Sequence, residues 1–311
     1  MPSRCSRSHQ GACGMGHFNG CRCHDCNHRQ GHMRQNPGLP KHKRSSVDLA
    51  NGFEGRHWES EDGHGSMCAG IAAGTSRDGG RYNGVAPDAQ VLAARCDLTM
   101  DGIIRTYECL LRMRAEGKIL GPLVISNSFS PKGCAPSQNA DDQHPLIEFV
   151  RLAVNMLRIP VIFSAGNNHR HCGHDPRSHE PSTIWGVNSI DEVLTIGAVA
   201  HDGSNQKPDF PHSHSSRGPG ELHRSHPKPD CVAPTFGEVV YGDDYRRMSW
   251  WGTSGAAPQA AGLAALLLSK NSSFLPSEVA DLIRNTATPL NFHPFCVGRG
   301  LINCAEAIAS L

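Results

Sequence analysis

From Ser45 onward, short apolar runs alternate with segments of helical periodicity, and this alternation restricts the folds open to the chain. Four of the runs have the length and composition of buried strands: QVLAARC, PLVISNSFS, IPVIFSAGNN and DEVLTIGAVA. Between them, apolar residues recur at the three- and four-residue intervals of a buried helix face, at Ile103, Tyr107, Leu110 and Leu111 and again at Leu146, Val150, Ala153 and Leu157. The sequence therefore predicts an α/β fold with a mostly parallel central sheet and helices on both faces.

The longest apolar helix is predicted within WWGTSGAAPQAAGLAALLLSK, from Trp250 to Lys270. Its N-terminus carries Ser254, next to unpaired backbone N–H groups and the positive end of the helix dipole. Pro258 is expected in the first turn, because a proline farther along would remove a helical hydrogen bond. A serine at this place is either an ordinary helix cap or a nucleophile.

Two other polar residues are predicted at comparable points of the fold. His64 lies in a Gly-flanked turn where a small-residue helix starts, and Asn167 directly follows the apolar strand VIFSAG. Active residues of open α/β sheets gather at the carboxyl ends of the strands. Each residue has a structural alternative, since a lone histidine is more often structural and an asparagine after a strand is usually a turn residue. Together with Ser254 they form the minimum set for acyl transfer.

Seven segments, in order, resemble the subtilisin-like serine proteases over roughly residues 45–311: DGHGSMCAGIAAG, VISNSFS, SAGNN, SSRGPG, KPDCVAP, GTSGAAPQAAG and GRGLIN. The resemblance implies a three-layer subtilisin-like fold and endopeptidase chemistry, with Ser254 as nucleophile and His64 as general base. It also implies that Asn167 donates its side-chain amide to the oxyanion. Ser128, Phe129 and Ser130 would form one edge of the substrate cleft, and Ala165 and Gly166 the other wall of the specificity pocket.

The third catalytic residue of that family, an aspartate at the end of the first core strand, is not found in its expected place. If NPGL (residues 36–39) matches the family's segment after the aspartate, Arg29 occupies the aspartate's position and no apolar strand precedes it. Asp25 lies four residues too early, and Asp48 and Asp62 fall in segments with other family counterparts. A cation beside the base would disfavour the imidazolium formed during acylation. The sequence thus leaves open whether the first core strand is present and whether the chain is an active protease or a pseudoprotease that binds peptides or partners in its cleft.

Residues 1–44 differ from the rest, and we predict a divergent or disordered segment there, ahead of a peptidase domain at 45–311. They hold five cysteines, six histidines and eight Lys/Arg against one acid, Asp25. Such a composition cannot supply a buried strand. Cys21, Cys23, Cys26, His28 and His32 have spacings that could hold zinc, but they match no common finger. A zinc module fused to an inert domain is therefore a third hypothesis, and an aberrant reading frame is a further explanation of the segment.

Composition limits the partners of the chain. The 311 residues carry a net charge of +1, which argues against a nucleic-acid partner, and no apolar run is long enough to span a membrane. Thirteen cysteines is an odd number in a chain that is not small, so a disulfide scaffold is not expected. Without a secretory signal, the default expectation is a cytoplasmic monomer with mostly reduced thiols and a polypeptide substrate.

The resemblance supplies two further expectations about ligands. Kexin-like relatives that cut after basic pairs carry acids beside the cleft, whereas SNSFSPKG supplies only Lys132, so a broad or apolar preference is expected. SRDGGRYNG is too short for a calcium loop, and we expect no metal or other cofactor. NHRHCGHDPRSHE (residues 168–180) contains His169, His171, Cys172, His174 and Asp175 and is predicted to be a solvated loop rather than a metal site.

Overall fold

Three of the apolar runs form neighbouring parallel strands in the main sheet. These are β4 (Ile125–Asn127), β5 (Val161–Ser164) and β6 (Leu194–Ala200). The sheet is completed by β8 (Cys231–Pro234), parallel to β6, and by the short antiparallel β7 (Phe210–Pro211). The computed structural model describes residues 44–48, 53–54, 63–75, 83–95, 98–135, 141–200, 210–241 and 244–311.

The fourth run forms β3 (Val91–Arg95), which belongs to a second sheet. This sheet has the order β2–β1–β3, where β1 (Arg44–Asp48) runs parallel to β3 and the two-residue β2 (Phe53–Glu54) is antiparallel to β1. Within the described ranges, no strand pairing joins β3 to β4. The three-stranded sheet and the main five-stranded sheet are therefore separate there. The segment around Arg29, where an aspartate-bearing strand was sought, lies outside the described residues.

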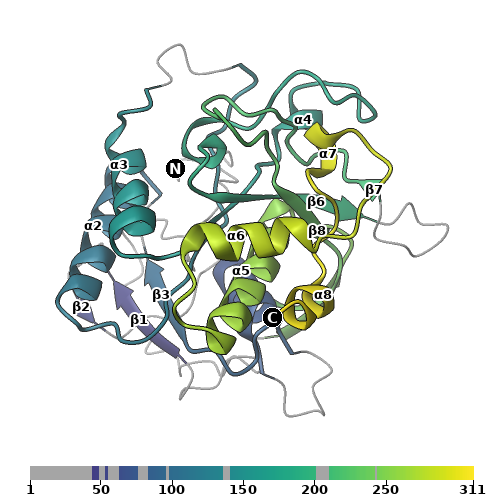
Figure 1. Cartoon of the computed structure of the whole chain (residues 1–311). Coiled ribbons are helices and arrows are strands. Elements are labelled where there is room, and N and C mark those ends of the chain that lie inside the picture. Colours follow the sequence, from purple (N-terminus) through teal and green to yellow (C-terminus); the bar gives the residue numbers. More distant parts are fainter. Residues whose placement is uncertain are drawn as a thin grey trace, which may run out of the picture.

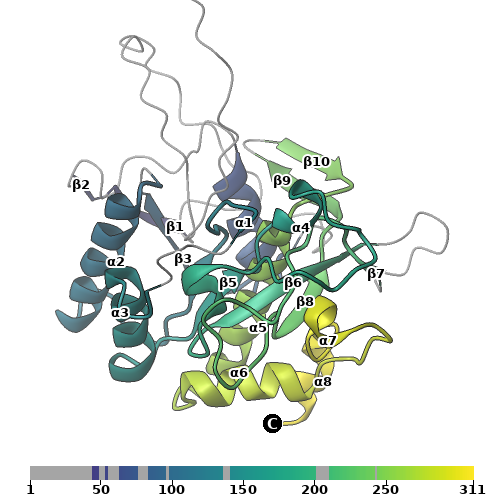
Figure 2. The ribbon, with the colours of Figure 1, turned by 90° about the horizontal axis from the view of Figure 1, so that it is seen from above.

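Alternate side chains of the main sheet enter two different cores, as the two-residue period of a strand requires. Val161 and Phe163 pack with α2 (Met100–Ala115) and α3 (Pro145–Arg151), whose apolar faces were predicted from the sequence. Ile162 packs instead with the central helix α5 (Thr253–Lys270), outside which lie α6 (Pro276–Asn285) and α8 (Cys304–Ala309). Figures 1 and 2 show the resulting layers, with α2 and α3 on one side of the strands and α5, α6 and α8 on the other. This confirms the predicted α/β fold with a largely parallel sheet and helices on both faces.

The helix α1 (His64–Ala73) packs against α5 and against a hairpin that the sequence analysis did not identify. The hairpin consists of β9 (Gly237–Tyr241) and β10 (Asp244–Met248). Val239 of β9 is buried against Met67 and Ile71 of α1. Three short helices and one π-helical turn complete the described elements: α4 (Asn168–His171), α7 (Pro294–Val297), the 3-10 turn η3 (Gly186–Ser189) and η2 (Leu152–Met156), which continues α3. None of the described helices has the length and apolarity needed to cross a bilayer.

One disulfide, Cys134–Cys172, was not anticipated from the cysteine count. It joins the segment after β4 to the residue that follows α4, across a sequence separation of 38 residues. Cross-linking a loop of this size restricts the unfolded chain and typically stabilises a protein by about 2–4 kcal/mol. Five other described cysteines, Cys68, Cys109, Cys231, Cys296 and Cys304, are free thiols.

Replacing Cys134 and Cys172 together by alanine is expected to lower the free energy of unfolding by about 2–4 kcal/mol. Denaturant titration of the double variant would measure the loss. Cys109→Ala is the control, because Cys109 is a free thiol and its replacement breaks no disulfide. A double variant as stable as this control would contradict the prediction.

Candidate active site

Ser254 is the second residue of α5 and is held at the start of that helix by a glycine turn. Gly252 precedes the helix with φ 71° and ψ 174°, a conformation that a residue with a side chain rarely adopts. The Ser254 side chain is buried, with 4% of the residue exposed, and its hydroxyl donates to the carbonyl oxygen of Ser128 at 3.2 Å. The predicted nucleophile therefore rests against the predicted cleft edge.

The expectation for Pro258 was wrong, because Pro258 is the sixth residue of α5 and not part of its first turn. A proline here cannot donate to the carbonyl oxygen of Ser254, four residues earlier. That oxygen instead accepts a hydrogen bond from the Ser128 hydroxyl at 2.9 Å and lies 3.5 Å from the Cys68 thiol. The missing helical bond thus leaves an acceptor that ties the start of α5 to β4 and α1.

His64 is the first residue of α1 and is half-buried. Its Nδ1 atom lies 3.9 Å from Sγ of Cys68, one helical turn later, and the same sulfur contacts the Ser254 carbonyl oxygen. Cys68 is 5% exposed and so forms a buried connection between the predicted base and nucleophile. The sequence analysis missed Cys68, although the four-residue spacing from His64 places both on one helix face.

Asn167 follows β5 and has its side-chain carbonyl oxygen fully engaged. This Oδ1 accepts from the backbone N–H of Thr253 at 3.0 Å and from the Thr253 hydroxyl at 2.9 Å. The amide orientation is thereby set, with Nδ2 only 3.1 Å from the point that a Cβ on Gly252 would occupy. The Thr253 hydroxyl also accepts from the N–H of Gly166 at 3.1 Å. An amide donor therefore faces the turn that carries Ser254, and Thr253, which the sequence analysis did not single out, orients it.

The two predicted cleft walls lie close together. Gly166 has φ 97°, and a Cβ at this position would lie 2.8 Å from the hydroxyl oxygen of Ser130. The buried Asn188 crosses between the walls, donating to the carbonyl oxygens of Phe129 at 2.7 Å and of Ser164 at 2.8 Å. Ser128, Phe129 and Ala165 are all buried. Apart from Phe129, the residues predicted to form the two walls have small side chains or none.

Several other residues singled out from the sequence lie outside the described residues. These are Asp25, Arg29, Asp62, the cluster Cys21–His32 and most of the segment SRDGGRYNG. Asp48 ends β1, opposite Arg95 of β3 in the parallel register. In the loop after Asn167, His169 is buried and Cys172 is in the disulfide, so this loop is less solvated than predicted. No cluster of three metal-ligating side chains occurs in the part of the chain that is described.

A sequence model of the subtilase family matches residues 27–300. The chain belongs to the subtilase family. The serine protease AprX of Bacillus subtilis (strain 168) is 29% identical to it over 272 residues, which cover 80% of this chain and 58% of that protein. Bacillopeptidase F of the same organism is 27% identical over 300 residues, covering 91% of this chain and 19% of that protein. The chain spans less than two thirds of the length of these curated relatives.

The fold is also that of solved subtilases. The crystal structure of MycP1 with its N-terminal propeptide removed superposes with a TM-score of 0.65 at 21% sequence identity. The match covers 88% of this chain and 87% of that one. It confirms the predicted three-layer subtilisin-like fold.

In this subtilase, replacing Thr253 by valine is expected to lower kcat about tenfold with little change in KM. The change removes one donor to Asn167 Oδ1 and the acceptor for Gly166, and each such hydrogen bond contributes about 0.5–1.5 kcal/mol. Steady-state hydrolysis of a chromogenic peptide gives both constants. Thr253→Ser keeps the hydroxyl and should retain most of the activity, whereas equal losses in both variants would contradict an orienting role for the hydroxyl.

A histidine lies against the tryptophan that precedes the Ser254 turn. The rings of His212 and Trp250 are stacked with centroids 3.6 Å apart. Burial, and to a lesser extent the charges of His214, Arg217 and Arg170, lower the pKa of His212 to about 4. The subtilase chain therefore holds this ring neutral down to mildly acidic pH.

Acidification from pH 6.5 to 4 is expected to destabilise the protein through His212. In the unfolded chain the His212 ring has a pKa of about 6.5 and takes up a proton as the pH drops, while the folded ring stays neutral. The folded state therefore becomes less stable as the pH decreases through this window. Because the ring is partly exposed, the expected loss in the free energy of unfolding is about 1–2 kcal/mol, which is less than the whole pKa shift of His212 would give. The melting temperature of His212→Gln should fall less between these pH values than that of wild type. His226→Gln, at an exposed position, should behave as wild type, and identical profiles for all three proteins would contradict the assignment.

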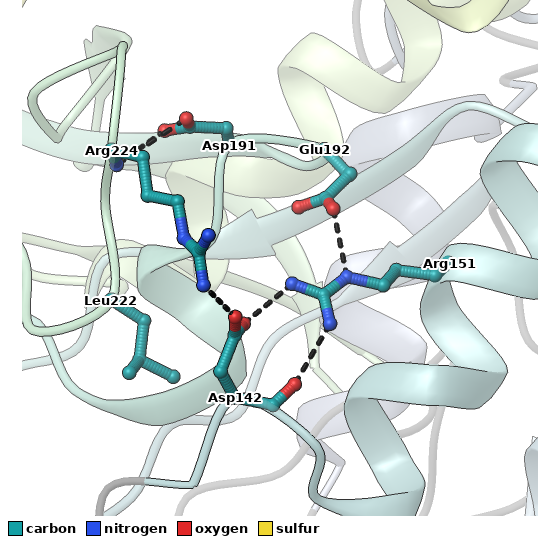
Figure 3. A pocket seen from close by; sticks show the side chains of 6 residues that line it. All are labelled: Asp142, Arg151, Asp191, Glu192, Leu222 and Arg224. Carbon is teal, nitrogen blue, oxygen red and sulfur yellow. Dashed lines mark hydrogen bonds and ion pairs between the residues drawn. The ribbon is translucent and has the colours of Figure 1, made fainter.

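Figure 3 shows a separate pocket of about 280 Å³, whose lining includes charged residues of both signs. Arg151 forms ion pairs with Asp142 at 2.5 Å and with Glu192 at 2.8 Å, and Arg224 also pairs with Asp142. Hydrogen bonds from the Ser225 hydroxyl and from the backbone N–H groups of residues 224–226 lower the pKa of Asp191 to about 2 despite its burial. The charged side chains that line this pocket are therefore already engaged in ion pairs or hydrogen bonds. None of the predicted site residues of this subtilase lines the pocket.

Proposed function

We propose that the chain is a serine endopeptidase that cleaves peptide bonds through an acyl-enzyme on Ser254, with His64 as general base. The observation that carries the proposal is the orientation of Asn167. Its carbonyl oxygen is occupied by Thr253, and its amide nitrogen therefore faces the turn that holds Ser254. A buried serine is common, but a preoriented amide donor beside it is what a tetrahedral oxyanion requires.

The chemistry follows from these groups. His64 removes the proton of the Ser254 hydroxyl as its oxygen attacks the substrate carbonyl carbon, giving a tetrahedral intermediate. The oxyanion accepts from Asn167 Nδ2 and from the backbone N–H of Ser254 at the start of α5. The imidazolium then gives its proton to the leaving amine, which releases the first product. A water molecule, deprotonated by His64, attacks the acyl-enzyme and regenerates Ser254.

The group that orients His64 defines the alternative function. The contact of His64 Nδ1 with the thiol of Cys68, at 3.9 Å, is too long for a strong hydrogen bond, and the aspartate that the family resemblance implies is not found at its expected place in the sequence. Without a carboxylate the imidazolium is poorly stabilised, and the protein would be a pseudoprotease that uses the same cleft to bind peptides. The similarity to AprX favours the enzyme, since AprX is a serine protease.

Fluorophosphonate labelling of the purified chain, read by intact mass, tests the proposal. Attack by Ser254 forms an oxygen–phosphorus bond and expels fluoride, so labelling requires an activated hydroxyl. We expect one label per wild-type chain and none on Ser254→Ala. A folded wild-type sample that stays unlabelled but binds peptides would support the pseudoprotease instead.

The proposed substrate is a polypeptide with a broad or apolar preference. The Phe129 ring is buried edge-on against Phe163, with centroids 5.4 Å apart, and the other residues predicted to form the pocket walls are serine, alanine and glycine. None of the residues predicted to line the pocket carries a carboxylate that could select basic residues. The cytoplasmic location and the monomeric state remain predictions, and the Cys134–Cys172 disulfide favours an oxidising compartment over the cytosol.

A further inference from the structure

Arg217 is a buried cation whose charge is not balanced by any described side chain. Only 1% of the residue is exposed. Its Nη2 donates to the carbonyl oxygen of His212 at 3.2 Å, while Nε and Nη1 have no hydrogen-bond partner among the described residues. Burial lowers the pKa of Arg217, yet a guanidinium stays protonated in proteins. Two charged donors are therefore left unsatisfied in the interior, where each is costly.

In the part of the chain that the structure describes, two other well-buried cations are paired with a carboxylate. Lys228, with no side-chain exposure, lies 2.7 Å from Asp230, and Arg284, with 10% exposure, lies 2.8 Å from the same residue. Arg217 forms no such ion pair within the described ranges. Among the described side chains, an acid thus balances Lys228 and Arg284 but not Arg217.

The titratable groups around Arg217 do not supply the missing negative charge. The positive charge of Arg217 contributes to lowering the pKa of His169 and of His212, so both rings lie within its field. Among the described residues, the Cys296 thiol acts to raise the pKa of Arg217, and burial raises the pKa of that thiol and so favours its neutral form. His169 Nδ1 is also buried and has no hydrogen-bond partner among the described residues. The described part of the site therefore has hydrogen-bond donors and no negatively charged side chain to balance Arg217.

We propose that Arg217 binds a small inorganic anion of about the size of chloride through its Nε and Nη1 groups. Charge-assisted hydrogen bonds from a guanidinium to an anion are among the strongest in proteins. The enclosure of Arg217 selects a monatomic ion over phosphate or a peptide carboxylate, because a larger ligand would need an opening to solvent. The backbone around Arg217 is fixed by reciprocal bonds with Thr183, whose N–H donates to the Arg217 carbonyl at 2.8 Å and whose hydroxyl accepts from the Arg217 N–H at 2.8 Å.

The anion would support the proposed active site through Ser216, the neighbour of Arg217. The Ser216 hydroxyl accepts from the N–H of Asn168 at 3.0 Å, and its own N–H donates to the carbonyl oxygen of Gly166 at 2.8 Å. Ser216 therefore holds both sides of Asn167. This consequence for activity rests on the proposed function, whereas anion binding itself does not.

Thermal unfolding of the full chain at constant ionic strength tests the proposal, with sodium chloride replacing sodium gluconate stepwise. We expect a saturable rise in melting temperature of about 2–4 °C in wild type. Arg217→Met removes the charge at similar volume and should abolish the response. Arg224→Met is the matched control, since Arg224 is 74% exposed and should leave the response intact. No chloride-specific rise in wild type, or the same rise in Arg217→Met, would overturn the proposal.

Diffraction from wild-type crystals grown in sodium bromide gives a second readout that does not depend on how the variant folds. An anomalous bromide peak beside Nε and Nη1 of Arg217 is expected. Water at both donors would overturn the proposal, and so would a bromide peak without any chloride effect on stability, which marks an adventitious ion. Fluorophosphonate labelling of the same samples separates this result from the fate of the proposed protease activity.

Discussion

Replacing Ser254 by alanine is expected to lower kcat for a peptide substrate about a millionfold if an acid orients His64, and only about a hundredfold if none does. The magnitudes come from subtilisin itself, a member of this family, where loss of the serine costs about 2 × 10⁶ in kcat and loss of the aspartate alone about 3 × 10⁴. Triad residues act as a unit, so a site that already lacks its acid has much less activity left to lose. The size of the loss therefore reports on the acid as well as on Ser254.

Single-turnover hydrolysis of an activated ester would give the acylation rate, and steady-state hydrolysis of a peptide would give kcat. His64→Ala should match Ser254→Ala within a fewfold, because each change stops the same proton transfer. Ser225→Ala, at an exposed serine that contacts Asp191, serves as the control for purification and folding. A Ser254→Ala protein with wild-type turnover would exclude the acyl-enzyme.

Local patterns predicted the central elements well, for a physical reason. Strand β5 is buried along its whole length and helix α2 has one apolar face, so composition and period alone identify them. The buried positions Tyr107 and Leu110 follow directly from that period. The placement of Ser254, His64 and Asn167 at element ends was likewise predictable, because each follows or begins a recognisable strand or helix.

Features that depend on contacts between distant segments were not predicted. The β9–β10 hairpin is stabilised by packing of Val239 on α1, which no local period reveals. The Cys134–Cys172 disulfide depends on the approach of two segments separated by 38 residues in the sequence. Pro258 was misplaced because its compatibility with the helix interior depends on Ser128, which lies directly after β4 and donates a hydrogen bond to the carbonyl oxygen of Ser254.

Asp230 is the single buried acid between two buried cations, and Asp230→Asn is expected to lower the free energy of unfolding by about 3–5 kcal/mol. Its Oδ2 accepts from Lys228 at 2.7 Å and from the N–H of Thr195 at 2.6 Å, and its Oδ1 accepts from Arg284 at 2.8 Å. Asparagine keeps the shape and can still accept from Thr195. The loss therefore measures the uncompensated charges of Lys228 and Arg284 rather than a cavity. Asp281→Asn removes the exposed partner of Arg284 and should lose less than about 1 kcal/mol.

The pH dependence of the Asp230→Asn loss separates charge from packing. Burial lowers the pKa of Lys228, against the opposing effect of Asp230. Without the aspartate this pKa falls further, and the folded lysine loses its proton while the unfolded lysine, with a pKa near 10.4, keeps it. The unfolded state then binds more protons, so the stability of the variant rises with pH up to that value. Urea titrations at pH 7 and pH 9.5 should show the gap to wild type narrowing, whereas a gap that stays constant would mean that Asp230 acts through packing and backbone contacts alone.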